Sequence, residues 1–151
     1  MKAMINNKIY KINIIDNSYS ATQCEVEILE GNFKGQRAIV SNTDIIIGKF
    51  TSKIEYVVSR EEDQFDNYKK KITGREFWVT ITTNNSIQNN EFIMYNLMEH
   101  IENNSDYAFH RCSGVEADNN KLTYIDSITV DDKDEYEEIK ELYKEWKEGV
   151  K

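Results

Sequence analysis

The pattern of hydrophobic and polar positions divides the chain into a strand-rich first part and a second part that mixes helices with strands. In the first part, short runs of β-branched and aromatic residues are separated by polar turn clusters, which is typical of β-strands. The alternation is cleanest at Cys24, Val26 and Ile28, which occupy every second position. The pattern predicts strands over residues 8–15, 23–30, 36–41, 44–50 and 53–59. Strands at this close spacing predict an antiparallel meander or a small barrel.

The second part opens with a predicted helix followed by a strand. Ser59 lies three residues before Glu62, the spacing of a capping box, and acidic residues fill the first turn. Three lysines at 69–71 match the negative end of the helix dipole, and Gly74 ends the helix. The alternation at 75–83 then predicts a strand. Two more strands are expected over 107–112 and 122–130, on either side of a turn around 117–120.

A second helix is predicted between a polar loop and the first of those two later strands. Asn90 is expected to cap its N-terminus, because asparagine is a favoured N-cap residue. Ile93, Leu97 and Ile101 then recur at intervals of four, with methionines beside them. This spacing predicts a stripe that faces the core, before the helix ends at residues 103–104.

The clearest element is the last helix, which begins after Asp132 and closes at Gly149. Asp132 and Glu135 have the spacing of a capping pair. One face carries an apolar stripe at helical spacing, formed by Tyr136, Ile139, Tyr143 and Trp146. The whole pattern predicts one compact α+β domain that ends in an amphipathic acidic helix. A division near residue 59 into a β-rich half (1–59) and an α/β half (60–151) is the alternative.

Composition adds an inference about origin. The chain of 151 residues has no proline, whereas an average protein has about 5%. Isoleucine, asparagine and lysine are frequent instead. The frequent residues have AT-rich codons and the avoided ones have GC-rich codons. We therefore expect the gene to belong to a low-GC bacterium, its phage or a mobile element.

Charge narrows the classes of partner. The net charge is -8, which argues against a surface that neutralises the phosphates of duplex nucleic acid. No segment approaches the roughly 20 apolar residues that cross a membrane, and the first ten residues lack the apolar core of a signal peptide. We therefore expect a cytoplasmic protein with no membrane partner.

Residues suited to catalysis or metal binding are few. Cys24 and Cys112 lie far apart in the sequence, which fits two buried thiols in a reducing compartment and leaves a single disulfide open. His100 and His110 are the only histidines, too few for a zinc ligand set. His110 and Cys112 share a face of one predicted strand, but no orienting group or oxyanion hole can be assigned to them. We assign no catalytic residue, cofactor or metal.

One segment shows a family resemblance. Residues 26–40 run from an apolar strand through Gly31, Lys34 and Gly35 to a second apolar pair, Ile39 and Val40. This pattern resembles a KOW motif, and the resemblance implies a small barrel that contacts RNA or protein. A simple hairpin loop is the alternative, and the acidic net charge favours it.

Two groups of residues are candidates for binding. Glu138, Glu141 and Glu145 belong to the acidic last helix and are expected to meet a basic groove on a protein partner. Trp146 would anchor that contact if its side chain is exposed. The second group combines cations with an aromatic ring, as a ligand with phosphate and a base requires: Arg60, Lys69, Arg75, Trp78 and Arg111.

The hypothesis that unites these observations is a non-enzymatic binding protein of a phage or mobile element. It would act as a stoichiometric antagonist of a host defence protein through its acidic surface, an assignment by analogy with a class of small accessory proteins. The first alternative is a small-ligand or nucleotide-binding sponge protein, expected to be a homo-oligomer. The second is an immunity protein that neutralises a toxin.

Overall fold

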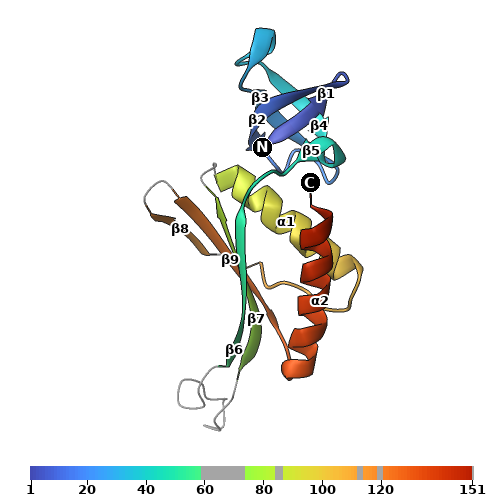
Figure 1. Cartoon of the computed structure of the whole chain (residues 1–151), viewed down its shortest axis with the longest axis vertical. Coiled ribbons are helices and arrows are strands. Elements are labelled where there is room, and N and C mark those ends of the chain that lie inside the picture. Colours follow the sequence, from blue (N-terminus) through green and yellow to red (C-terminus); the bar gives the residue numbers. More distant parts are fainter. Residues whose placement is uncertain (59–73, 84–86, 112–113, 119–120, 151) are drawn as a thin grey trace.

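Two antiparallel sheets and two helices form the part of the chain that the computed structural model describes, residues 1–58, 74–83, 87–111, 114–118 and 121–150 (Figure 1). One helix lies between the two sheets and contacts both. This arrangement confirms the predicted α+β domain. The helix predicted between Ser59 and Gly74 falls on residues 59–73, which lie outside the described residues.

The first sheet has the strand order β4-β3-β2-β1-β5. Its strands are β1 (Lys2–Ile5), β2 (Lys8–Asp16), β3 (Gln23–Ile28), β4 (Arg37–Ser41) and β5 (Ile45–Ile46). Sequence analysis missed β1, which forms a hairpin with β2. Asn6 and Asn7 connect these strands with φ values of 50° and 66°. Such left-handed conformations suit a two-residue hairpin turn, and asparagine tolerates them.

The first sheet is an open meander and not a barrel. Its outer strands, β4 and β5, follow each other in the sequence, but β4 pairs with β3 and β5 pairs with β1. Within residues 1–58, all of which are described, β4 and β5 do not pair with each other. The strand expected over 44–50 is also much shorter, because a 3-10 helix at Asn42–Asp44 precedes it.

The segment that resembles a KOW motif forms a hairpin. It comprises β3, a 3-10 helix at Gly31–Phe33 and β4. Gly31 and Gly35 have φ values of 78° and 88°, which glycine adopts without the strain that other residues experience. The glycines are therefore explained by the connection, and the small barrel implied by the resemblance is not formed.

The second sheet has the order β6-β7-β9-β8. Its strands are β6 (Thr51–Val58), β7 (Arg75–Thr83), β8 (Gly114–Asp118) and β9 (Lys121–Thr129). The strands predicted at 53–59, 75–83 and 122–130 are confirmed within two residues. The first of these belongs to the second sheet, so the chain changes sheets between β5 and β6 and not near residue 59.

The strand predicted at 107–112 is wrong. Residues 107–111 have no strand structure, although the His110 N–H donates a hydrogen bond to the Ser127 carbonyl. The strand that pairs with β9 on this side is β8, which includes residues where a turn was expected. A neighbouring strand supplies its hydrogen bonds, so weak local patterning was enough for a strand at this edge of the sheet.

Two helices cover one face of the second sheet: α1 (Ile87–Asn103) and α2 (Lys133–Gly149) (Figure 1). Helix α1 packs on β7 and β9 and also contacts β2 of the first sheet, while α2 packs on β6, β7 and α1. The predicted stripes of both helices are buried. Among the described residues, neither helix is long and apolar enough to cross a membrane.

Of the two predicted N-cap residues that the structure describes, Asp132 is confirmed and Asn90 is wrong. Asn90 does not cap α1, because the helix begins at Ile87 and Asn90 lies in its first turn. The buried Asn90 side chain instead donates a hydrogen bond to the Leu122 carbonyl, at 2.8 Å. Asp132 does cap α2, and its side chain accepts a hydrogen bond from the Glu135 N–H at 3.0 Å.

Candidate functional site

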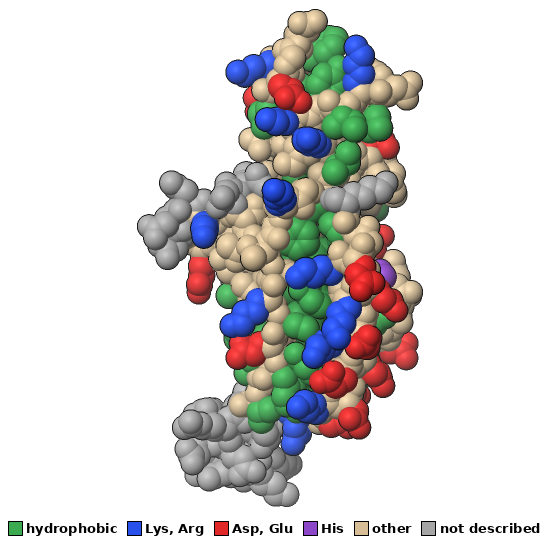
Figure 2. Space-filling view, viewed as in Figure 1, with side chains coloured by type: hydrophobic (Ala, Val, Ile, Leu, Met, Phe, Trp, Pro, Cys, Tyr) green, Lys and Arg blue, Asp and Glu red, His purple; other side chains and the backbone are tan. Residues whose placement is uncertain are grey.

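The outer face of α2 carries the predicted acidic side chains. Glu138, Glu141 and Glu145 are all exposed, and their spacing of three and four residues places them on one side of a helix with 3.6 residues per turn. We call these three residues the acidic face. Figure 2 shows acidic side chains in a row along this helix, beside basic side chains (lysine or arginine) that follow the apolar seam next to it.

The acidic face is only weakly neutralised by its neighbours. The Glu141 carboxylate lies 3.4 Å from the Lys144 ammonium, and the Glu145 carboxylate lies 3.6 Å from His100 Nε2. The Glu141–Lys144 pair is exposed and the glutamate of the other pair is exposed as well, and ion pairs open to solvent contribute little to stability. They are therefore easily exchanged for the cations of a binding partner.

A shallow groove lies beside the acidic face, between α2 and the segment that follows α1. It has a volume of about 660 Å³. We call it the α2 groove; its lining residues are Asn104, Ser105, Asp106, Tyr107, Glu135, Glu138, Glu141 and Leu142. The half-buried side chains of Tyr107 and Leu142 give it an apolar part, and carboxylates surround them. The α2 groove thus combines apolar contact area with negative charge.

Tyr107 connects the α2 groove to the acidic face. Its hydroxyl donates a hydrogen bond to the Glu138 carboxylate at 3.0 Å. Burial, this hydrogen bond and the negative charges of Glu135, Glu138 and Asp132 raise the pKa of Tyr107 to about 12. The phenol is therefore held neutral, and its raised pKa reflects burial first and the nearby negative charges in addition.

Trp146 is a core residue and not an exposed anchor. Its side chain is 4% exposed, and its ring packs against Phe50 and Tyr143, with centroids 5.4 and 6.1 Å apart. Its indole N–H donates a hydrogen bond to Asn96 Oδ1 at 2.8 Å. The residues that could take the anchoring role are Tyr107 and Leu142, which sequence analysis missed. Leu142 could have been found because it lies one turn after Glu138, whereas nothing in the sequence places Tyr107 there.

The described members of the alternative ligand set do not form a common site. Arg75 and Trp78 lie on opposite faces of β7, because side chains alternate along a strand. The Arg75 side chain donates to the Asp131 carbonyl at 3.2 Å, and the Trp78 indole donates to Glu76 on the uncovered face. Arg60 and Lys69 lie outside the described residues.

Arg111, the last member of that set, is already paired. Its guanidinium donates two hydrogen bonds to the Glu102 carboxylate, at 2.8 and 2.6 Å. Burial alone would raise the pKa of Glu102, but the hydrogen bonds from Arg111 and the Phe109 N–H outweigh it and lower that pKa. The pair attaches the segment after α1 to the end of that helix.

Cys112, which was considered together with His110, lies outside the described residues. The His110 ring hydrogen-bonds to the Thr129 hydroxyl at 2.8 Å. Cys24 is a free and fully buried thiol. Burial, together with the charge of Asp16, raises its pKa to about 11, so this thiol is unsuited to act as a nucleophile near neutral pH.

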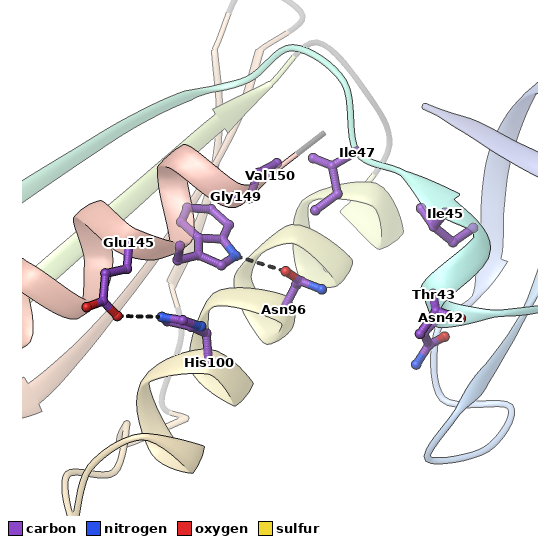
Figure 3. Close-up of a pocket in the computed structure, with 10 residues that line it drawn as sticks. Asn42, Thr43, Ile45, Ile47, Asn96, His100, Glu145, Gly149 and Val150 are labelled. Carbon is purple, nitrogen blue, oxygen red and sulfur yellow. Dashed lines mark hydrogen bonds and ion pairs between the residues drawn. The ribbon is translucent and has the colours of Figure 1, made fainter.

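A second hollow lies between the first sheet and the two helices (Figure 3). It has a volume of about 360 Å³, and we call it the inter-sheet cleft. Its lining residues are Asn42, Thr43, Ile45, Ile47, Asn96, His100, Glu145, Trp146, Gly149 and Val150. A neighbouring hollow of about 520 Å³ shares five of these residues and adds Glu99. Sequence analysis did not identify this site, because its residues come from three separate parts of the chain.

Two buried polar atoms of the inter-sheet cleft have no hydrogen-bond partner among the described residues: Asn42 Oδ1 and His100 Nε2. The Asn42 amide nitrogen donates to the Ala21 carbonyl at 3.5 Å, which assigns the amide oxygen to the unpartnered position. His100 Nε2 faces Glu145, but at 3.6 Å the contact exceeds the length of a hydrogen bond. The cleft therefore offers one unsatisfied acceptor, Asn42 Oδ1, and an imidazole nitrogen without a hydrogen-bond partner among the described residues.

Comparison with known proteins finds no family model, no curated protein and no solved structure that matches this chain. Among the described residues, no group of three or more His, Cys, Asp or Glu side chains is placed to hold a metal ion. The function must therefore be argued from the two hollows and the acidic face themselves.

Proposed function

We propose that this protein is a non-enzymatic binding protein that covers a basic surface of a protein partner with the acidic face and the α2 groove. In the cytoplasm of a low-GC bacterium, the partner would be a host defence protein and this chain its stoichiometric antagonist. An immunity protein that neutralises a toxin would use the same surface in the same way.

The observation that supports this proposal is the meeting of charge and apolar area in one place. Three exposed carboxylates share one side of α2, and the adjoining α2 groove presents the half-buried side chains of Tyr107 and Leu142. Interfaces commonly place an aromatic or aliphatic anchor at the centre and charged residues around it. Charge complementarity would accelerate association and select a basic partner.

The alternative of a nucleotide-binding sponge protein has less support. Arg75 and Trp78 face opposite sides of β7, and Arg111 is engaged by Glu102. A ligand with phosphate and a base would need charge and ring on the same side. We therefore favour a protein partner over a phosphate-containing ligand.

The test is affinity capture from the lysate of a low-GC bacterium, followed by native mass spectrometry of the complex. A variant with Glu138→Lys, Glu141→Lys and Glu145→Lys reverses the acidic face. The wild type should retain a partner of tens of kilodaltons that the variant loses, and its affinity should fall steeply as salt screens the charges. An added mass of only a few hundred daltons, released on denaturation, would favour the ligand alternative instead.

A matched control separates the site from net charge. Asp44, Glu55 and Glu116 are exposed carboxylates on other elements, and changing all three to lysine alters the net charge by the same amount. This control should capture the partner as the wild type does. Equal capture by the control and the face-reversed variant would contradict the proposed surface.

A further inference from the structure

The inter-sheet cleft has the chemistry of a site for a positively charged side chain. We propose that it receives the guanidinium group of an arginine that the partner presents. This inference rests on the proposed function, because it adds a specific contact to the binding of a basic partner. The cleft also adds residues of the first sheet and of α1, which do not belong to the acidic face.

The acceptor atoms of the cleft require hydrogen-bond donors. Asn42 Oδ1 is unpartnered among the described residues and only accepts, and His100 Nε2 also accepts in the tautomer that carries its proton on Nδ1. The Glu145 carboxylate adds acceptor oxygens beside His100. A guanidinium has five N–H donors in one plane and no acceptor, so one group can satisfy acceptors on several sides.

The charge of the lining also favours a cation. Of the described residues around the cleft and its neighbouring hollow, Glu99 and Glu145 are ionisable acids, and none is lysine or arginine. A phosphate or carboxylate ligand would meet two carboxylates there and, among the described residues, no lysine or arginine. A guanidinium would be attracted, and it keeps its charge when it is partly desolvated.

The walls of the cleft suit the rest of an arginine side chain. Ile45, Ile47 and Trp146 line it with apolar atoms, against which the methylene stem can pack while the charged end reaches the polar atoms. Figure 3 shows Asn96 between these walls, with its oxygen directed to Trp146. Its amide nitrogen is left to donate to a main-chain carbonyl of the same bound segment, which favours a peptide over a free ion.

The inter-sheet cleft is continuous with the acidic face through Glu145, which belongs to both. Glu138 lies seven residues before Glu145 on α2, a distance of about 10 Å at 1.5 Å per residue. A basic segment that follows the acidic face would therefore reach the cleft within a few residues. One partner can occupy both places at once.

The experiment uses the full chain and two blocked tripeptides, Gly-Arg-Gly and its citrulline counterpart. Citrulline keeps the shape of arginine but has no charge. In ¹H–¹⁵N NMR titrations, we expect the arginine peptide to shift the side-chain amides of Asn42 and Asn96 and the Trp146 indole signal. The citrulline peptide should bind at least about tenfold more weakly. Equal binding of the two peptides, or no shift of these three signals, would overturn the proposal.

Variants locate the binding in the cleft. Glu145→Gln and Asn42→Ala should each weaken binding of the arginine peptide about tenfold, whereas Glu55→Gln, at an exposed position of β6, should leave it unchanged. A dispersed NMR spectrum verifies that each variant is folded, and the exposed position of Glu145 makes its conservative change safe for folding. Unchanged affinity in both cleft variants would refute the site.

The two proposals fail in different ways. If face reversal abolishes partner capture while Glu145→Gln and Asn42→Ala affect neither capture nor the arginine peptide, the cleft inference is wrong and the proposed function stands. If the arginine peptide binds as expected but the wild type captures no protein, the cleft inference stands as a site for arginine and the proposed function is wrong.

Discussion

Helices α1 and α2 have the same length, 17 residues, but they serve the fold in opposite ways. Helix α1 is enclosed by β2, β7, β9 and α2, so it forms the connection between the two sheets. Helix α2 packs with one face and leaves the other to the solvent. Figure 1 shows α1 between the first sheet and α2. The comparison shows that α1 is mainly a packing element with a small exposed part, whereas α2 is exposed along one whole side.

The polar residues of the two helices differ accordingly. Helix α1 buries two asparagines, and Asn89 Oδ1 accepts a hydrogen bond from the Ile14 N–H of the first sheet at 3.0 Å. The buried side chains of α2 are aliphatic or aromatic, and its charged residues face outward. Buried amides make α1 specific for its neighbours, because each must find a partner that only this packing provides.

The largest effect should come from the enclosed helix. Leu97 of α1 is fully buried, so Leu97→Ala should lower the free energy of unfolding by about 2–5 kcal/mol through lost burial and the cavity it leaves. Because α1 contacts both sheets, chemical denaturation should show one cooperative transition in circular dichroism and tryptophan fluorescence. Glu99→Ala, at an exposed position of the same helix, should change stability by less than about 0.5 kcal/mol. Two separate transitions would show that α1 does not connect the sheets energetically.

A smaller loss is expected from the contact between α1 and the first sheet. Asn89→Ala removes the acceptor of the buried Ile14 N–H and should cost about 1–3 kcal/mol, the range for leaving a buried group unsatisfied. Amide hydrogen exchange at Ile14 should accelerate more than the global unfolding rate requires. The control is Asn103→Ala, at the exposed end of α1. If Asn89→Ala and the control were equally mild, α1 would be held by apolar packing alone.

Loss of the N-terminal cap of α2 should lower the free energy of unfolding by less than the two changes in α1 do. Asp132→Ala removes the cap that accepts the Glu135 N–H and should lower the free energy of unfolding by about 0.5–2 kcal/mol. The loss should appear mainly as faster amide exchange in the first turn. Asp134→Ala, at an exposed position in that turn, is the matched control and should retain the cap. A larger loss from Asp132→Ala than from Asn89→Ala would reverse the proposed difference between the helices.

The smallest effect on stability is expected from the contact between α2 and the segment that follows α1. Tyr107→Phe removes the exposed hydrogen bond to Glu138 and should cost on the order of 0.5 kcal/mol at neutral pH. In the folded wild type the pKa of Tyr107 is raised from 10 to about 12, so folding favours its neutral form. This contribution is complete below about pH 10 and is lost as the pH rises through about 12. The phenolate absorbance that differs between wild type and Tyr107→Phe should therefore titrate near pH 12; titration near pH 10 would contradict the negative environment of the groove.

The features of α2 were predictable because their causes are local. Asp132 caps a helix whose start it immediately precedes, and the stripe from Tyr136 to Trp146 follows the helical period. The exposure of Glu138, Glu141 and Glu145 follows from the same period, because these residues lie opposite that stripe. The position of these three glutamates on the exposed side of α2 was therefore predictable from the sequence.

The start of α1 and strand β8 were not predictable in this way. Asn90 has the residue type of a cap, but its side chain bonds to Leu122, which is far away in the sequence. Residues 114–118 are mostly of types that are depleted in strands, and they pair because β9 lies next to them. In both places a long-range partner outweighs the local preference, and one sequence does not reveal such partners.

The sequence by itself determined the alternation of the strands, the cap and stripe of α2 and the acidic charge, because these depend on residues a few positions apart. Only the tertiary structure decided that Trp146 is buried, that Tyr107 and Leu142 border the acidic face, and that Asn42 and His100 line one cleft. These features join residues dozens of positions apart. Their positions follow from how the two sheets pack around α1, which is a property of the whole chain.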